Sequence, residues 1–111
     1  MTIEELRLWG ADVDTGVKRC AGKESLYLKL VDKMGKDQNL PRLRQAIEEG
    51  DLEAAFEAAH GLKGLVTNLS LTPLSDLVVP LTEDLRAGKE KDYGPVLEEI
   101  QRVYEKLILS H

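Results

Sequence analysis

The chain has 111 residues, 42% of them hydrophobic and 32% charged, a composition typical of one soluble domain with a single core. Its net charge of −5, from 20 acidic and 15 basic residues, argues against nucleic acid or an anionic membrane as the main partner. The single cysteine, Cys20, excludes a disulfide within the chain, and with two histidines it cannot supply the four ligands of a usual His/Cys zinc site.

The N-terminus has neither the basic segment nor the apolar segment of a signal peptide, and no stretch is apolar enough to span a membrane. We therefore expect a cytoplasmic protein with one domain over residues 1–111.

Apolar residues at helical spacing predict a short N-terminal helix over residues 2–10, which Gly10 ends. Asp14 is expected to cap a brief helical connector that reaches Ala21, with Gly22 as its stop. An apolar stripe then predicts a helix over about 23–38.

Two helices in the middle of the chain are separated by a very short gap. The first is predicted over 39–49, with Pro41 tolerated in its first turn and Gly50 at its end. Asp51 then caps the central helix, over about 51–70. Because the gap is so short, these two helices must form an antiparallel hairpin.

Two further helices are predicted over 73–87 and 93–109, and Thr72 is expected to cap the first of them ahead of Pro73. Pro80 lies inside that helix and is expected to kink or split it, most simply as a bend around the core. The near-heptad apolar pattern of the last helix is interpreted as bundle core rather than as a dimer seam.

No segment alternates as a strand would, so the predicted fold class is all-α. The simplest arrangement is an antiparallel up-down four-helix bundle, with its core over about 23–109 and a short extra N-terminal helix over one end.

The central helix carries an unusual stretch around His60. Gly61 and Gly64 lie on either side of Lys63, and each glycine costs a helix roughly 1 kcal/mol relative to alanine. On a helical projection His60 and Gly64 lie well off the centre of the apolar arc, and Lys63 lies at its edge. We interpret the glycines as residues that keep the face around an exposed imidazole bare.

A neutral imidazole is a good nucleophile near neutral pH, and a lysine one turn away can neutralise an oxyanion such as phosphate. No carboxylate, serine or second histidine is placed to form a triad with His60. Neither glycine-rich nucleotide motif is present. These observations indicate that the activated group arrives on another macromolecule.

The stretch Ala59-His60-Gly61-Leu62-Lys63-Gly64, continuing to Asn68-Leu69, resembles the A-H-x-L-K-G-x-x-x-N-L-G signature of histidine phosphotransfer (HPt) domains. The resemblance covers residues 12–105. Upstream, the arrangement similar to the family's lead-in to its first core helix consists of Asp14, Arg19, Gly22, Tyr27 and Leu30.

The resemblance implies a four-helix bundle in which His60 accepts a phosphoryl group from the aspartyl phosphate of a receiver domain and passes it on. Lys63 would steady the phosphoryl charge, and Gly64 would allow close docking. The expected partners are response-regulator receiver domains, a hybrid sensor kinase, or both. Mg²⁺ would belong to the receiver, so no cofactor is expected on this chain, which would be a phosphotransfer intermediate rather than an enzyme with its own small-molecule substrate.

We expect a stand-alone monomer whose docking surface surrounds His60. This surface includes Glu57, Gly61 and Thr67, with Leu8 of the N-terminal helix as a further candidate. Two alternatives are a receiver-binding adaptor without phosphotransfer activity and a purely structural helical bundle. A buried His60 would favour the structural bundle.

The sequence departs from the family's pattern at a few positions. Ser70 stands where the family often has glycine, and Leu65 stands where it often has a small residue. Thr82 lies near the position from which many members bond the imidazole with a polar side chain, often glutamine, and it could do so only if Pro80 does not swing it away.

Overall fold

The computed structural model describes residues 1–108, which fold entirely into helices and their connections. The predicted all-α class is therefore confirmed over this range. In chain order the elements are α1 (Ile3–Trp9), α2 (Val13–Arg19), α3 (Glu24–Asp32), the 3-10 turn η1 (Lys33–Lys36), α4 (Asn39–Glu48), α5 (Leu52–Asn68), α6 (Thr72–Arg86) and α7 (Gly94–Ile108). Residue 109, the last of the predicted bundle core, and His111 lie outside the described residues.

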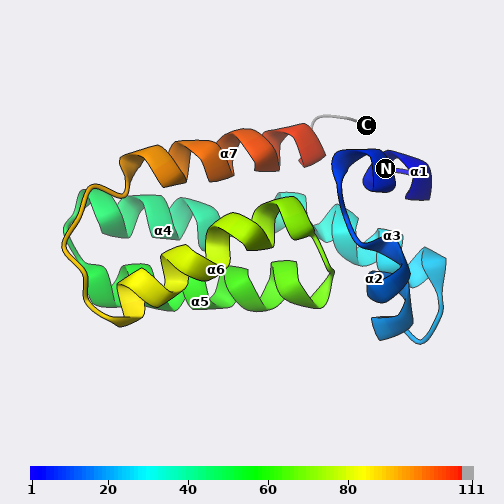
Figure 1. The fold of residues 1–111 in the computed structure, drawn as a ribbon, viewed down its shortest axis with the longest axis horizontal. Helices are drawn as coiled ribbons and strands as arrows, with labels where there is room; N and C mark the ends of the chain where they lie inside the picture. Colours follow the sequence, from blue (N-terminus) through cyan, green and yellow to red (C-terminus); the bar gives the residue numbers. More distant parts are fainter. Residues whose placement is uncertain (109–111) are drawn as a thin grey trace.

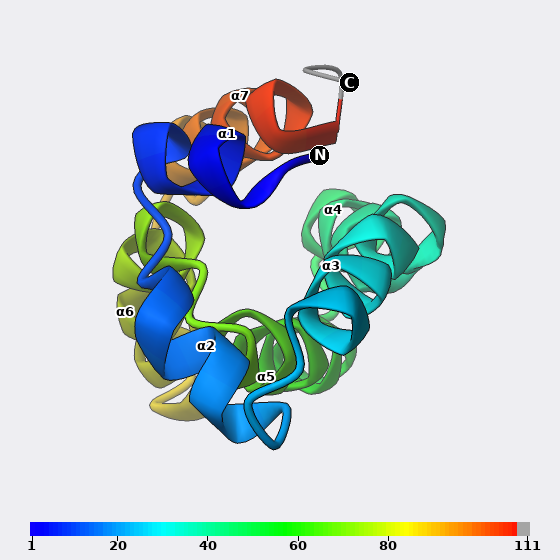
Figure 2. The same cartoon turned by 90° about the vertical axis from the view of Figure 1, so that its right-hand side faces the viewer.

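Helix α5 lies in the middle of the molecule, with α4 on one side and α6 on the other (Figures 1 and 2). Helix α7 packs against α6 and also contacts α1. The apolar face of α5 supplies Ala59, Leu62 and Val66 to the core, and each of these is at most 1% exposed. No helix within residues 1–108 has both the length and the hydropathy needed to cross a lipid bilayer.

The hairpin of α4 and α5 follows from its capping residues. Gly50 has φ 71°, a left-handed conformation that glycine adopts without steric cost, and it follows the end of α4. The Asp51 side chain then accepts a hydrogen bond of 3.0 Å from the backbone N–H of Ala54, so it caps α5 as predicted.

The N-terminal third of the chain has the predicted helices with different ends. The segment expected to be a brief helical connector is the helix α2, and its cap is Asp12 rather than Asp14. The carboxylate of Asp14 instead accepts a hydrogen bond of 2.8 Å from Arg7, which lowers its pKa. The helix predicted over 23–38 ends at Asp32 and tightens into η1.

Pro80 does not split α6, which runs as one helix from Thr72 to Arg86. Pro80 is exposed, and so is Asp76, whose carbonyl would otherwise accept a bond from residue 80, so water can take the place of the missing donor. The start of α6 also differs by one residue from the prediction, because Leu71 occupies the N-cap position instead of Thr72.

The N-terminal segment covers the carbonyl end of α5. Arg19 donates from Nη1 to the Thr67 carbonyl at 2.5 Å, Tyr27 donates to the Leu69 carbonyl at 2.8 Å, and the Asp12 N–H donates to the Ser70 carbonyl at 2.9 Å. A cation suits this end because the helix dipole is negative there. These three bonds fix the end of the helix that carries His60.

Ser70 occupies a backbone position that favours glycine. Its φ is 55°, and it forms the turn that closes α5: its own N–H bonds the Thr67 carbonyl, and the next N–H, of Leu71, bonds the Val66 carbonyl. A left-handed conformation costs a residue with a Cβ roughly 1–2 kcal/mol. Serine in place of glycine at this position therefore lowers the stability of the fold and leaves the course of the chain unchanged.

Replacing Tyr27 with phenylalanine should destabilise the fold by about 1 kcal/mol at neutral pH, because the Leu69 carbonyl loses its buried donor. Burial also raises the pKa of Tyr27 from 10.0 to about 12. Because the folded-state pKa is the higher one, this contribution is complete below pH 10 and is lost as the pH rises towards 12.

Urea unfolding at pH 7 and across the alkaline range measures both effects. Tyr104→Phe is the control, since burial also raises the pKa of Tyr104 but its hydroxyl donates to the Met34 carbonyl in η1 and not to the carbonyl end of α5. If Tyr27→Phe kept the full alkaline loss of the native protein, this account of Tyr27 would be wrong.

Candidate functional site

His60 lies on the exposed crest of α5, in its third turn. The ring of Phe56, one turn earlier, stacks on the imidazole with a centroid distance of 5.7 Å and an angle of 30° between the planes. Among residues 1–108, no hydrogen bond or ion pair engages the imidazole, so both of its nitrogens are open to a reactant. The exposure of His60 is the opposite of what a purely structural histidine would show.

The two flanks of His60 face different helices. At 100° per residue, positions 56 and 63 fall on one side of residue 60, whereas positions 57 and 64 fall on the other. The contacts agree with this geometry, since the first side faces α6 and the second faces α4.

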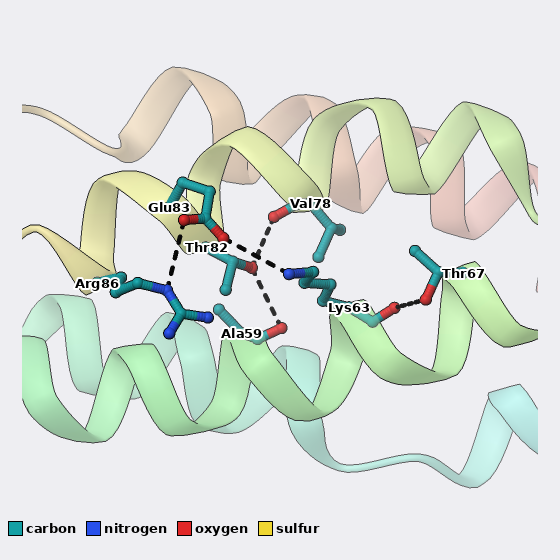
Figure 3. A network of polar contacts seen from close by, with 7 residues as sticks. All are labelled: Ala59, Lys63, Thr67, Val78, Thr82, Glu83 and Arg86. Atoms are coloured by element: carbon teal, nitrogen blue, oxygen red, sulfur yellow. Dashed lines mark hydrogen bonds and ion pairs between the residues drawn. The ribbon is translucent and has the colours of Figure 1, made fainter.

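On the α6 side, Lys63 is not a free cation. Its Nζ lies 3.5 Å from Oε1 of Glu83, and the second carboxylate oxygen of Glu83 lies 3.4 Å from Nε of Arg86 (Figure 3). The guanidinium of Arg86 also lies over the ring of Phe56, 5.1 Å from its centroid. One carboxylate thus bridges two cations, and one of these cations contacts the ring that stacks on His60.

On the α4 side, Gly61 and Glu57 border a different surface. A Cβ on Gly61 would come within 3.0 Å of the side-chain amide of Asn39, so this glycine allows α4 to approach closely. Glu57 lines a groove of about 360 Å³ between α4 and α5, which also contains Arg42 and Gln45.

Gly64 behaves as predicted for a bare position. It is exposed, and a Cβ built on it would meet nothing within 4 Å apart from its own helix. The interpretation that both glycines keep the face open therefore applies to Gly64, whereas Gly61 is a packing glycine.

Two of the threonines considered from the sequence bond the backbone. Thr67 donates to the Lys63 carbonyl at 2.7 Å, which holds its hydroxyl against its own helix. Thr82 is fully buried, and its hydroxyl lies 2.7 Å from the Val78 carbonyl and 3.4 Å from the Ala59 carbonyl. The expectation that Thr82 could bond the imidazole is therefore wrong, because its side chain points into the interface between α5 and α6 (Figure 3).

The remaining positions singled out from the sequence lie apart from this cluster. Leu65 is half-buried and packs against the core. Leu8 is 89% exposed on α1, which contacts α2 and α7. Its part in docking stays a prediction.

Three neighbours of the site were not predicted from the sequence: Phe56, Glu83 and Arg86. Phe56 could have been found, since it precedes His60 by four residues on one helix. The two charged residues come from α6, and no pattern in the sequence of α6 alone indicates that they face Lys63. The site therefore combines an unprotected nucleophile with two cations, a set suited to a multiply charged anion.

The chain matches the Hpt domain family over residues 34–108, or 75 of its 111 residues. The matched segment contains α4 to α7 and with them His60, Lys63 and Gly64. Helices α1 to α3 precede it, so the part of the family resemblance on residues 12–33 stays a prediction. No curated protein and no solved structure matches the chain significantly.

Proposed function

Because this chain belongs to the Hpt domain family, we propose that it is a histidine phosphotransfer protein of a two-component phosphorelay, with His60 as the residue that carries the phosphoryl group. The observation that carries this proposal is the exposed, unbonded imidazole on a helix within the matched segment. In this proposal α4 to α7 are the four helices of an antiparallel up-down bundle, whereas the fold prediction placed the bundle core over about 23–109.

The proposed reaction is an in-line displacement at phosphorus. An imidazole nitrogen of His60 forms the N–P bond while the O–P bond of an aspartyl phosphate on a receiver domain breaks, and its electron pair stays on the receiver's carboxylate. The proton on the other imidazole nitrogen remains there or leaves to water. The reverse displacement passes the group on to a carboxylate of a second receiver.

Lys63 is proposed to neutralise charge on the transferring phosphoryl group, because its ammonium is the nearest cation to His60 on α5, one turn away. Gly64 is proposed to admit the receiver surface, since its position is open. Glu57, Gly61 and Thr67 are proposed to border that surface. Any divalent cation is proposed to belong to the receiver, because no three His, Cys, Asp or Glu side chains among residues 1–108 are grouped as metal ligands.

The test is incubation with a receiver domain whose aspartate carries labelled phosphate. We expect the label to move to this protein and to show the acid lability and alkali stability of a phosphohistidine. Mass spectrometry should place it on His60. Stable binding of the receiver without any transfer would contradict the proposal and favour the adaptor.

A further inference from the structure

Glu83 is the one residue that contacts both cations on the α6 side of His60 within the described part of the chain. Each of its carboxylate oxygens faces a different cation, Lys63 on α5 and Arg86 on its own helix (Figure 3). The ion pair with Lys63 therefore crosses from one helix to the other. A bridging carboxylate of this kind neutralises part of the positive charge that the site presents.

The same cations are the ones that an incoming phosphoryl group would meet. Lys63 follows His60 by one turn, and Arg86 contacts the ring of Phe56, which stacks on the imidazole. A phosphoryl group brings about two negative charges at neutral pH. It therefore competes with the carboxylate of Glu83 for the same partners, and the carboxylate also repels it.

We propose that Glu83 is a positioning residue that competes with the phosphoryl group for Lys63 and Arg86 and so limits how firmly phosphorylated His60 is held. This inference rests on the proposed function. During transfer the N–P bond to His60 forms as the aspartyl O–P bond breaks, and Lys63 exchanges Glu83 for the phosphoryl oxygens. Arg86 divides its contacts between Glu83 and the same oxygens, and Glu83 draws both cations back when the group leaves.

The exposure of the two paired side chains, Lys63 and Glu83, makes this exchange feasible. The Lys63 side chain is 29% exposed and that of Glu83 is 52% exposed, so water reaches both partners and the pair is weak. A strong buried ion pair would keep Lys63 from binding the phosphoryl group. A weak pair only shifts the equilibrium between Lys63 bound to Glu83 and Lys63 bound to the phosphoryl group. A phosphoryl carrier needs its phosphorylated state to be weakened in this way, because a phosphoryl group bound too firmly could not be passed on.

The experiment measures the equilibrium ratio of phosphorylated His60 to phosphorylated receiver by ³¹P NMR. Glu83→Gln removes the charge and keeps the shape of the side chain. We expect the ratio to rise roughly two- to fivefold, the range that corresponds to an exposed ion pair, and the gain to shrink at high salt.

Asp76→Asn is the matched control. Asp76 precedes Glu83 by seven residues and so lies on the same face of α6 two turns away, is exposed, and makes no ion pair among residues 1–108. Asp76→Asn removes the same charge without releasing Lys63, so it should change the ratio of phosphorylated His60 to phosphorylated receiver clearly less than Glu83→Gln does. Combining Glu83→Gln with Lys63→Met should also reduce the effect of Glu83→Gln, because the competition then has one partner fewer.

The outcomes separate the two proposals. If the native protein is not labelled, the proposed function is wrong and this inference falls with it. If the native protein is labelled at His60 but Glu83→Gln leaves the ratio unchanged, or shifts it no more than Asp76→Asn, the inference alone is overturned. A lower ratio in Glu83→Gln would also overturn it, because Glu83 would then orient Lys63 rather than compete for it.

Discussion

His60→Gln should abolish transfer of phosphate from a phosphorylated receiver domain to this protein. Glutamine has about the reach of histidine and can hydrogen-bond, but its amide nitrogen is not a nucleophile at neutral pH. The His60 side chain is exposed, and within residues 1–108 its only ring or polar contact is the stack on Phe56, so the fold should keep its stability within about 0.5 kcal/mol. Labelled-phosphate transfer and urea unfolding on the same preparation measure both quantities.

The chain provides its own control for this experiment, because His111 is the other of its two histidines. His111→Gln should leave the labelling intact, and the two variants together assign the label to one ring. If His60→Gln were labelled as well as the native protein, His60 would not be the acceptor. A His60→Gln protein that binds the receiver with unchanged affinity would place the loss in the chemical step rather than in docking.

The helices were predictable because their signals are local. Apolar residues recur at helical spacing along each one, and single residues mark their ends, as Gly50 does with its left-handed backbone and Asp51 does with its cap. The error at α2 is of the same local kind, since Asp12 and Asp14 are both plausible caps and the structure uses the first. Of the two effects predicted for Pro80, the split of α6 does not occur, because the bond that Pro80 removes lies next to water, and the bend stays a prediction.

The site was predictable only along α5. The order of His60, Lys63 and Gly64 on one helix fixes which of them are neighbours, and the structure confirms that His60 and Gly64 are exposed. The partners on other helices were not predictable, because they depend on how α6 is rotated against α5. That rotation buries Thr82, which was a candidate to bond the imidazole, and brings Glu83 to Lys63 instead.

The contacts that cover the carbonyl end of α5 also could not be predicted from local sequence patterns. Arg19 and Tyr27 lie 48 and 42 residues from the carbonyls that they bond. Nothing in their immediate sequence indicates a partner so far along the chain. The family resemblance included both residues but gave them no structural task, and the structure shows that they hold the end of the helix that carries His60.

Gly64 and Gly61 should respond in opposite ways to the same substitution. Gly64→Ala should stabilise the fold by about 0.5–1 kcal/mol, because alanine is the better helix former and its methyl group meets open space. Gly61→Ala should gain less or lose stability, because its methyl group would press on Asn39 at 3.0 Å. Urea unfolding of the two variants beside the native protein measures the difference.

The rates of phosphotransfer of the Gly64 variants should not follow their stabilities. A larger side chain at Gly64, as in Gly64→Gln, should slow transfer about tenfold or more, because it occupies the surface where the receiver must bring phosphorus into line with the imidazole. Gly64→Ala should show a smaller loss in the same direction while its stability rises. A variant that is more stable yet slower cannot owe its slowness to unfolding, so the loss would reflect docking. If Gly64→Gln transferred phosphate at the native rate, the receiver would have to approach His60 from another side, and the α6 flank with Lys63 would be the remaining path.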